Sequence, residues 1–173
     1  MNNGLKTIPS RPPQHNTHRV EVKLRAEFAD AEGLSALAVL HSLGLNAARE
    51  VRTSQIYEIH GPLSSAQVQQ AAKELLCDPV TQEFRLLAPP QPVSNGMQHW
   101  RVEVWLKETV TDPVAETVAG ALREMGHPAP ESVRVGTAYN ITGKCGRHHL
   151  ERIVPRSLAN PVIHRFSVAE DHP

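Results

Sequence analysis

The chain has few of the features that mark several large classes of protein. Its 173 residues include 18 basic and 18 acidic side chains. This balance gives no net field to hold the molecule on nucleic acid or on an anionic membrane. Two cysteines, Cys77 and Cys145, are too few for a disulfide scaffold. No apolar run approaches the ~18 residues of a membrane span, and the first residues lack the apolar core of a signal peptide. We therefore expect a soluble cytoplasmic protein that binds neither nucleic acid nor membrane.

Two stretches lack the periodicity of helices and strands. Residues 1–17 are polar and rich in Pro and Asn, which is typical of a flexible leader. Residues 88–98, APPQPVSNGMQ, oppose both helix and central strand, which is typical of a linker. The sequence therefore predicts a leader (1–17), a first unit (18–87), a linker (88–98), a second unit (99–169) and a short tail (170–173).

The two units are copies of one another. A shift of 82 residues aligns residues 19–86 with 101–168 without a gap. The identical residues fall both in apolar stripes and at turns, which chance similarity rarely achieves. They include Arg19/Arg101, Val20/Val102, Glu21/Glu103, Val22/Val104, Leu24/Leu106, Asp30/Asp112, Leu40/Leu122, Gly44/Gly126, Val51/Val133, Arg52/Arg134, Tyr57/Tyr139, Ile59/Ile141, Gly61/Gly143, Pro79/Pro161, Val80/Val162 and Phe84/Phe166.

The first part of each unit predicts a strand followed by a helix. RVEVKLR and RVEVWLK alternate apolar and polar residues, as in a half-buried strand. Asp30 and Asp112 stand at helix N-cap positions, and Gly44 and Gly126 at the helix ends. The expected buried stripes of these helices are Leu34, Leu37, Leu40 and Leu43 in the first unit, and Val114, Val118, Ala121, Leu122 and Met125 in the second.

The second part of each unit predicts strand, helix and strand. EVRTSQIYEIHG and SVRVGTAYNITG are rich in strand-forming residues. A helix follows, with Ser64 or Ser65 as its cap and Val68, Ala71, Ala72 and Leu75 on one face in the first unit. Pro155 should shorten or kink its counterpart. Pro79 and Pro161 are placed as first residues of closing strands. We predict an α+β fold of two β-α-β-α-β repeats that share a core or a continuous sheet as a pseudo-dimer.

The quoted motifs resemble a known family. VEVWLKETVTDPVAETVAGALREMG with SVRVGTAYNITG and SLANPVIHRFSV is similar to PurS, the small subunit of phosphoribosylformylglycinamidine synthase. HRVEVKLRAEFADAEGLSALAVLHSLG with VRTSQIYEIHG and LLCDPVTQEFRL looks like the same unit. The tandem also resembles the N-terminal region of the long, fused form of that synthase. Ala31 departs from the pattern, as does the pair Thr53–Ser54, which replaces Val135–Gly136. The resemblance implies a ferredoxin-like-related fold.

The resemblance also implies a role in purine biosynthesis. PurS is a dimeric organiser without catalytic residues or cofactor, and it joins an ATP-dependent synthetase subunit of the PurL type to a glutaminase subunit of the PurQ type. We expect this chain to bridge these partners and to support ammonia transfer, so the ligase chemistry would lie on the partners. Self-association of the chain stays open. A rival hypothesis from another class is a free-standing module that senses a small molecule at the interface between the repeats.

Five residues are candidates for an interface. Arg52 and Arg134 enter the long strands at matched sites, where guanidinium groups bind carboxylates or phosphates, although an intramolecular salt bridge explains them equally well. Tyr57 and Tyr139 are also matched, and tyrosine is favoured at interfaces as well as at the rim of a core. Trp105 replaces Lys23 on the polar face of the first strand, so a partner or the other repeat must cover that face.

Three further residues form a pattern suggestive of a metal or a nucleophile, and Cys77, the other candidate thiol, is expected to be a small buried hydrophobic residue. Cys145, His148 and His149 form C-x-x-H-H, which lacks a matching distant ligand pair, so we expect a solvated start of a helix rather than a metal site. An enzyme that uses Cys145 and these histidines is the third and weakest hypothesis.

Glu21 and Glu103 alternate with buried valines, and we expect solvated or cross-strand-paired carboxylates there.

Overall fold

The computed structural model describes residues 16–87 and 99–171. The strands are β1 (Asn16–Leu24), β2 (Ala48–Gly61), β3 (Gln82–Leu87), β4 (His99–Leu106), β5 (Ser132–Gly143) and β6 (His164–Asp171). The helices are α1 (Ala31–Ser42), α2 (Ser65–Ala71), α3 (Pro113–Glu124) and α4 (Arg147–Ile153). A π-helical turn, η1 (Ala72–Leu76), extends α2, and a 3-10 turn, η2 (Val154–Arg156), extends α4. The predicted linker and most of the predicted leader lie outside the described residues.

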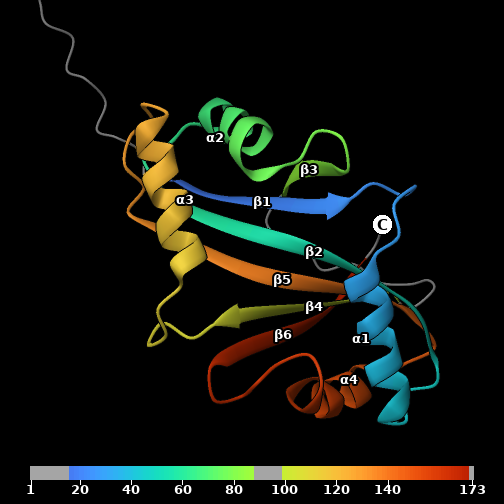
Figure 1. Ribbon diagram of the computed structural model, residues 1–173. Coiled ribbons are helices and arrows are strands. Elements are labelled where there is room, and N and C mark those ends of the chain that lie inside the picture. Colours follow the sequence, from blue (N-terminus) through green and yellow to red (C-terminus); the bar gives the residue numbers. More distant parts are fainter. Residues whose placement is uncertain (1–15, 88–98, 172–173) are drawn as a thin grey trace, which may run out of the picture.

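The six strands form one antiparallel sheet. Its order is β3-β1-β2-β5-β4-β6, so each repeat contributes three neighbouring strands, and β2 pairs with β5 at the junction (Figure 1). Asn16 pairs with Gly61, and His99 pairs with Asp171. This pairing starts β1 inside the predicted leader and extends β6 into the predicted tail. The predicted α+β fold of two β-α-β-α-β repeats in a pseudo-dimer is confirmed.

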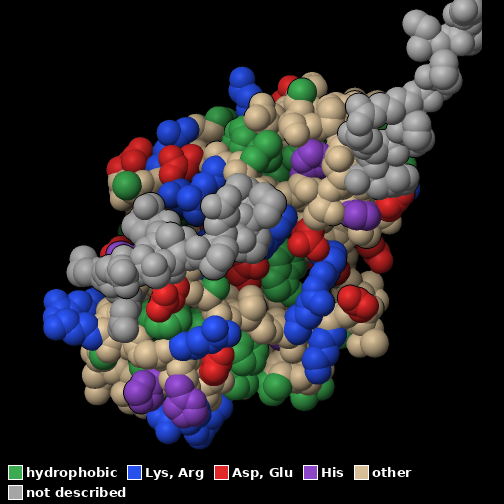
Figure 2. Space-filling model, turned by 180° about the vertical axis from the view of Figure 1, so that it is seen from behind, with side chains coloured by type: hydrophobic (Ala, Val, Ile, Leu, Met, Phe, Trp, Pro, Cys, Tyr) green, Lys and Arg blue, Asp and Glu red, His purple; other side chains and the backbone are tan. Residues whose placement is uncertain are grey.

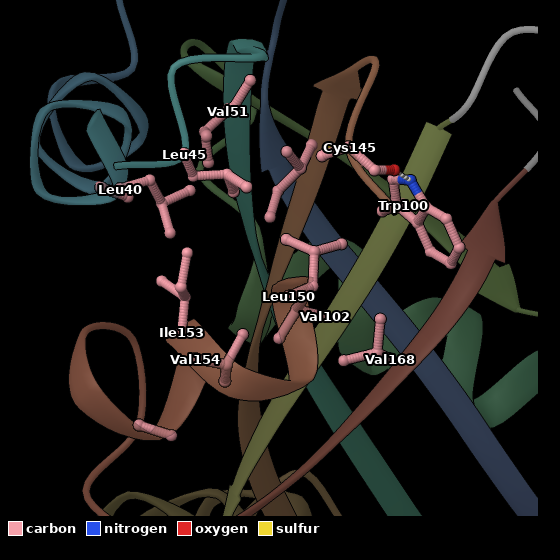
Figure 3. Close-up of a cluster of buried hydrophobic side chains, with 14 of the residues drawn as sticks. Leu40, Leu45, Val51, Trp100, Val102, Cys145, Leu150, Ile153, Val154 and Val168 are labelled. Carbon is pink, nitrogen blue, oxygen red and sulfur yellow. Dashed lines mark hydrogen bonds between the residues drawn. The ribbon is translucent and has the colours of Figure 1, made fainter. Parts of the chain in front are cut away.

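The first helix of each repeat packs on the other repeat. Leu40 of α1 is buried among residues of the second repeat that include Val102, Leu150 and Ile153 (Figure 3). Leu122 of α3 is buried with residues of the first repeat that include Val20, Val22, Ile59, Val68 and Ala72. In Figure 1, α1 accordingly lies beside α4, and α3 beside α2, all on one face of the sheet. Neither core is complete without a helix from the other repeat.

Matched local signals set the ends of α1 and α3. The carboxylate of Asp30 accepts a hydrogen bond from the Gly33 amide and also one from the Thr53 amide on β2. Asp112 does the same with the amides of Ala115 and Val135. Each cap therefore also ties the start of its helix to the long strand of its own repeat. Gly44 and Gly126 follow the helices at φ +91° and +79°, a conformation that glycine adopts without strain.

Some apolar residues do not face the core as the sequence predicted. Leu34 is 63% exposed, because α1 buries Gly33, Ala36 and Leu40 instead, a spacing of three and four residues. Leu43, which caps the helix, is also exposed, as is Val114 on α3. In the other helix of the first repeat the π-helical turn widens the last turn, so Leu76 rather than Leu75 points inward.

Proline positions give one confirmed prediction and one correction. Pro155 ends α4 after Ile153 and lies in η2, as predicted for a residue without a backbone donor. Pro79 and Pro161 are not the first residues of strands. Each lies in a loop, and the strand begins three residues later, at Gln82 or His164.

None of the helices in residues 16–87 and 99–171 is long and apolar enough to cross a membrane.

Candidate functional site

The face of the sheet opposite the helices carries a charged network that joins the two repeats. Side chains alternate across a strand, so Arg19 and Glu21 of β1 point away from the helices, as do Arg101 and Glu103 of β4. Figure 2 shows basic and acidic side chains side by side on this face. These four residues, here called the central quartet, occupy equivalent positions in the two repeats.

The central quartet forms two reciprocal ion pairs. Arg101 Nη1 donates to Glu21 Oε1 at 2.7 Å, and Arg19 Nη2 donates to Glu103 Oε2 at 2.6 Å. The arginine of each repeat thus binds the glutamate of the other, across the two central strands. Arg101 Nε also donates to Glu103 Oε1 at 2.9 Å, which links the two pairs. Charge-assisted contacts of this kind fix orientation as well as adding energy.

Glu21 is the most buried member of the quartet. Its side chain has no exposed surface, and its carboxylate accepts hydrogen bonds from the Ser54 hydroxyl at 2.6 Å and from Arg85. Burial alone would raise the pKa of Glu21. The charge of Arg101 and the hydrogen bonds from Ser54, Arg101 and Arg85 outweigh burial and lower the pKa. The carboxylate is therefore ionised inside the protein at neutral pH. Of the two expectations for Glu21, the solvated carboxylate is wrong and the cross-strand-paired carboxylate is confirmed, because Glu21 faces Arg85 in the β1–β3 register and binds it.

Trp105 makes the two halves of this face different. Its ring is 8% exposed and packs with Ile56 and Leu87 of the first repeat. The guanidinium carbons of Arg19 and Arg134 lie 5.7 and 5.4 Å from the ring centroid. The ring also lies over Gly136, where a Cβ would come within 2.6 Å of it. The cover predicted for this face is supplied largely by the other repeat.

The other four predicted interface residues do not form one site. Arg52 donates to the carbonyls of Leu24 at the end of β1 and of Arg25 and Phe28 in the loop that follows, each at 3.4 Å. Its equivalent Arg134 lies 3.5 Å from Glu58 instead. Tyr57 is buried and donates to Gln55, whereas Tyr139 is half-buried. Burial raises the pKa of both phenols. Contact of these residues, or of Trp105, with a partner stays a prediction.

The C-x-x-H-H residues are separated by burial. Cys145 is 2% exposed, and its carbonyl accepts a hydrogen bond from Trp100 Nε1 at 2.6 Å (Figure 3). Burial raises the pKa of the Cys145 thiol, which disfavours a thiolate nucleophile. His148 and His149 are exposed on α4. Among residues 16–87 and 99–171, no three His, Cys, Asp or Glu side chains lie close enough together to hold a metal ion.

A cavity of about 430 Å³ lies beside the quartet and is shared by both repeats. Residues of mixed charge line it, and they include Glu21, Arg52, Arg85, His99, Asn140 and Thr142. The sequence reasoning missed this cavity, and it also missed the quartet as a unit. The signal for the quartet was present in the identical R-V-E-V segments. Each segment supplies one arginine and one glutamate, so the arginine of one repeat can pair with the glutamate of the other.

The comparisons with known proteins agree with the duplicated architecture. The family model PurS, phosphoribosylformylglycinamidine (FGAM) synthase, matches residues 17–89 and again residues 99–171. A relative in Synechocystis, phosphoribosylformylglycinamidine synthase subunit PurS, is 26% identical over 84 residues, which cover 46% of this chain and 84% of the relative. A crystal form of B. subtilis PurS is 28% identical, with a TM-score of 0.40. The match spans 44% of this chain and 100% of the B. subtilis chain. Because the family model matches both halves of the chain, the chain belongs to the PurS family, as a tandem duplication of the PurS unit.

Proposed function

We propose that this chain is the non-catalytic assembly subunit of a phosphoribosylformylglycinamidine synthase complex in cytoplasmic purine biosynthesis. It bridges the ATP-dependent synthetase subunit and the glutaminase subunit and supports the transfer of ammonia between them. The observation that carries this proposal is that two PurS units, joined through residues 88–98, form one sheet with exchanged helices and a reciprocal ion-pair network. One chain therefore supplies the two-unit body that an organising subunit needs.

The chemistry of the sheet face opposite the helices supports an organising role. Arg101 donates to both Glu21 and Glu103, in a network that holds the repeats in register. The pKa of Glu21 is lowered, whereas a carboxylate that acts as general acid or base near neutral pH needs a raised pKa. The lowered pKa therefore argues against Glu21 as a general acid or base near neutral pH, which supports the proposed non-catalytic role of the chain.

The experiment measures amidine formation by the synthetase and glutaminase subunits of the same organism, with and without this chain. Glutamine and free ammonia serve as alternative nitrogen sources. We expect glutamine-driven turnover to need the chain and ammonia-driven turnover to be independent of it. The ammonia reaction is the internal control, because it does not require coupling. If neither rate responds and the proteins do not co-elute, the proposal is wrong.

The shared cavity favours one second candidate, a module that binds a small molecule between the repeats. Arg52, Asn140 and Thr142 would supply a cation and hydrogen-bonding groups to a polar ligand. This function predicts that a specific metabolite raises the melting temperature of the isolated chain. The substitution Arg52→Gln should remove that shift. A metabolite screen in which no compound raises the melting temperature would exclude this candidate.

A further inference from the structure

The cavity beside the central quartet lies where the first repeat differs from the second. Lys23 and Arg52 are among the residues that line it. The shift of 82 residues makes Lys23 the counterpart of Trp105, and Arg52 the counterpart of Arg134. The second repeat therefore shows with which groups the protein itself satisfies the corresponding arginine.

In the second repeat, a ring and a carboxylate satisfy Arg134. Its guanidinium carbon lies 5.4 Å from the centroid of the Trp105 ring, within the range of cation–π attraction. Its Nη1 lies 3.5 Å from Glu58 Oε1. Glu58 is the residue directly opposite Arg134 in the β2–β5 register. The ring thus covers the arginine, and the carboxylate neutralises it.

In the first repeat, Arg52 has neither of these partners. Asn140, the counterpart of Glu58, is the residue directly opposite Arg52 in the same register. Within residues 16–87 and 99–171, Arg52 forms no ion pair, and its three hydrogen bonds go to main-chain carbonyls at 3.4 Å. These carbonyls carry no net charge, and they leave other N–H groups of the guanidinium as donors. The positive charge of Arg52 is therefore not neutralised by the described part of the chain.

Lys23 leaves open the space beside Arg52 that an aromatic ring takes in the second repeat. Its Nζ pairs with Glu83 Oε1 of β3 at 3.2 Å. Because β3 and β2 flank β1 on opposite sides, this ion pair draws the Lys23 side chain away from Arg52 on β2. The cavity of about 430 Å³ is the consequence.

Asn140 provides a second donor for an anion in this cavity. Its Oδ1 accepts a hydrogen bond from Arg101 Nη1 at 3.1 Å, which leaves its amide N–H groups as donors. Both Arg52 and Asn140 line the cavity and are half-buried.

The acids that line the cavity do not replace the missing carboxylate. Glu21 is bound by Arg101, and Glu83 is bound by Lys23. Glu50 is exposed to solvent and lies outside ion-pair distance of Arg52. Arg52 and Asn140 therefore remain as the pair of half-buried donors that an anion can use.

We propose that this cavity binds a small planar aromatic anion. The ring lies on the guanidinium of Arg52, and the carboxylate or phosphate of the ligand accepts hydrogen bonds from Arg52 and Asn140. A guanidinium can do both at once, because it stacks through its face and donates from its edge. The ligand thus supplies from solution the two groups that Trp105 and Glu58 supply in the second repeat.

This proposal rests on the second candidate function, a ligand site between the repeats, and gives that site its class of ligand. The volume of the cavity falls within the ~300–1,000 Å³ that is typical of small-molecule sites. Both repeats line the cavity, so the bound ligand contacts both. The assembly role of the chain does not depend on it.

The test is isothermal titration calorimetry of the full-length chain with two complete probes and their parts. Indole-3-acetate carries a ring and a carboxylate, and adenosine monophosphate carries a ring and a phosphate. The partial probes are acetate, inorganic phosphate, indole and adenosine. We expect a complete probe to bind at least about ten-fold more tightly than either of its parts. The tighter of the two complete probes identifies the anionic group.

Three variants locate the site. Arg52→Gln removes the cation, and Asn140→Glu places a carboxylate opposite Arg52, as Glu58 stands opposite Arg134. We expect each of these two variants to bind the complete probe at least about ten-fold more weakly. The matched control is Arg134→Gln, which should leave binding unchanged, because the ring and the carboxylate of the protein already occupy Arg134. Far-UV circular dichroism melting checks that each variant folds.

Other binding patterns overturn the proposal. If the complete probes bind no more tightly than their parts, or do not bind, the ligand class is wrong. If Asn140→Glu and Arg52→Gln bind the complete probe as the unchanged chain does, the site is not this cavity. Equal losses in Arg52→Gln and Arg134→Gln would also contradict it. A metabolite of another class that raises the melting temperature would keep the second candidate function while this ligand class fails, and the amidine-formation experiment tests the assembly role separately.

Discussion

Arg101 Nη1 lies 2.7 Å from Glu21 Oε1, although the two residues are 80 positions apart and belong to different repeats. The equivalent residues, Arg19 and Glu103, make the same contact in the opposite direction. Because each repeat supplies one cation and one anion, the pairing matches the approximate two-fold symmetry of the sheet. The central quartet therefore links the two repeats in the same arrangement as the β2–β5 strand pairing.

Removal of Arg101 tests the energetic role of the quartet. The side chain of Glu21 has no exposed surface and that of Arg101 is 11% exposed, so Arg101→Ala leaves a buried carboxylate without its main partner. We expect the free energy of unfolding to fall by about 3–5 kcal/mol, measured by urea denaturation. Arg147→Ala is the control, because the Arg147–Glu151 pair is exposed and should contribute at most ~0.5 kcal/mol. Equal effects of the two substitutions would contradict the account.

The lowered pKa of Glu21 predicts a specific acid sensitivity. A carboxyl group whose pKa is lower in the folded than in the unfolded state stabilises the fold above its unfolded value, here 4.5. This contribution is lost as the pH falls through the lower, folded pKa. The difference in unfolding free energy between the unchanged chain and Glu21→Gln should therefore shrink below about pH 4.5. Urea denaturation between pH 3 and 7 measures it, and a constant difference would show that Glu21 is not the group responsible.

The packing of Trp105 can be tested at Gly136, which lies under its ring, with Gly120 as a control glycine away from it. A Cβ on Gly136 would lie 2.6 Å from the Trp105 ring and 2.9 Å from the Val104 carbonyl oxygen, so Gly136→Ala should cost about 1–3 kcal/mol. Gly120 lies in α3 with its nearest neighbouring atom 4.0 Å away, and Gly120→Ala should stabilise the protein by about 0.5–1 kcal/mol. Thermal denaturation compares the two variants. Changes of the same sign would contradict the packing described for Trp105.

The exchange of first helices predicts that the two repeats unfold together. Leu40 belongs to the first repeat and is buried in the core that holds the second repeat's strands, so Leu40→Ala should cost about 2–5 kcal/mol. Both tryptophans, Trp100 and Trp105, lie in the second repeat and report on it by fluorescence. We expect fluorescence and far-UV circular dichroism to give one coincident transition, shifted equally by the substitution. A fluorescence transition that Leu40→Ala leaves unmoved would mean that the repeats fold independently.

Local structure was largely predictable, because its signals lie within a few residues. Alternation identified β1 and β4, and the caps at Asp30 and Asp112 marked the starts of α1 and α3. The threefold spacing of Leu34, Leu37, Leu40 and Leu43 was misleading, since a stripe with that spacing drifts around a helix of 3.6 residues per turn. The π-helical turn that exchanges Leu75 for Leu76 has no comparable signal in the sequence.

Contacts between the repeats were not predictable from either repeat alone. The apolar face of α1 would be buried equally well on its own strands, so the pattern does not reveal that Leu40 reaches Leu150. Alternation placed Glu21 correctly on the polar face of its strand. Its burial with a paired charge depends on Arg101, which comes near only when the strands of the two repeats join into one sheet. The repeat itself was the one clue, because identical charged residues in both copies indicate a symmetric interface.

The most direct test of the central claim, that one chain contains the complete two-repeat body, is its mass in dilute solution. Analytical ultracentrifugation or native mass spectrometry should give 19.1 kDa at the lowest measurable concentration, because the helices are exchanged within the chain. A mass of twice that value that persists on dilution would mean that the working body needs two chains, as it would if the helices were exchanged between them, and it would contradict the account.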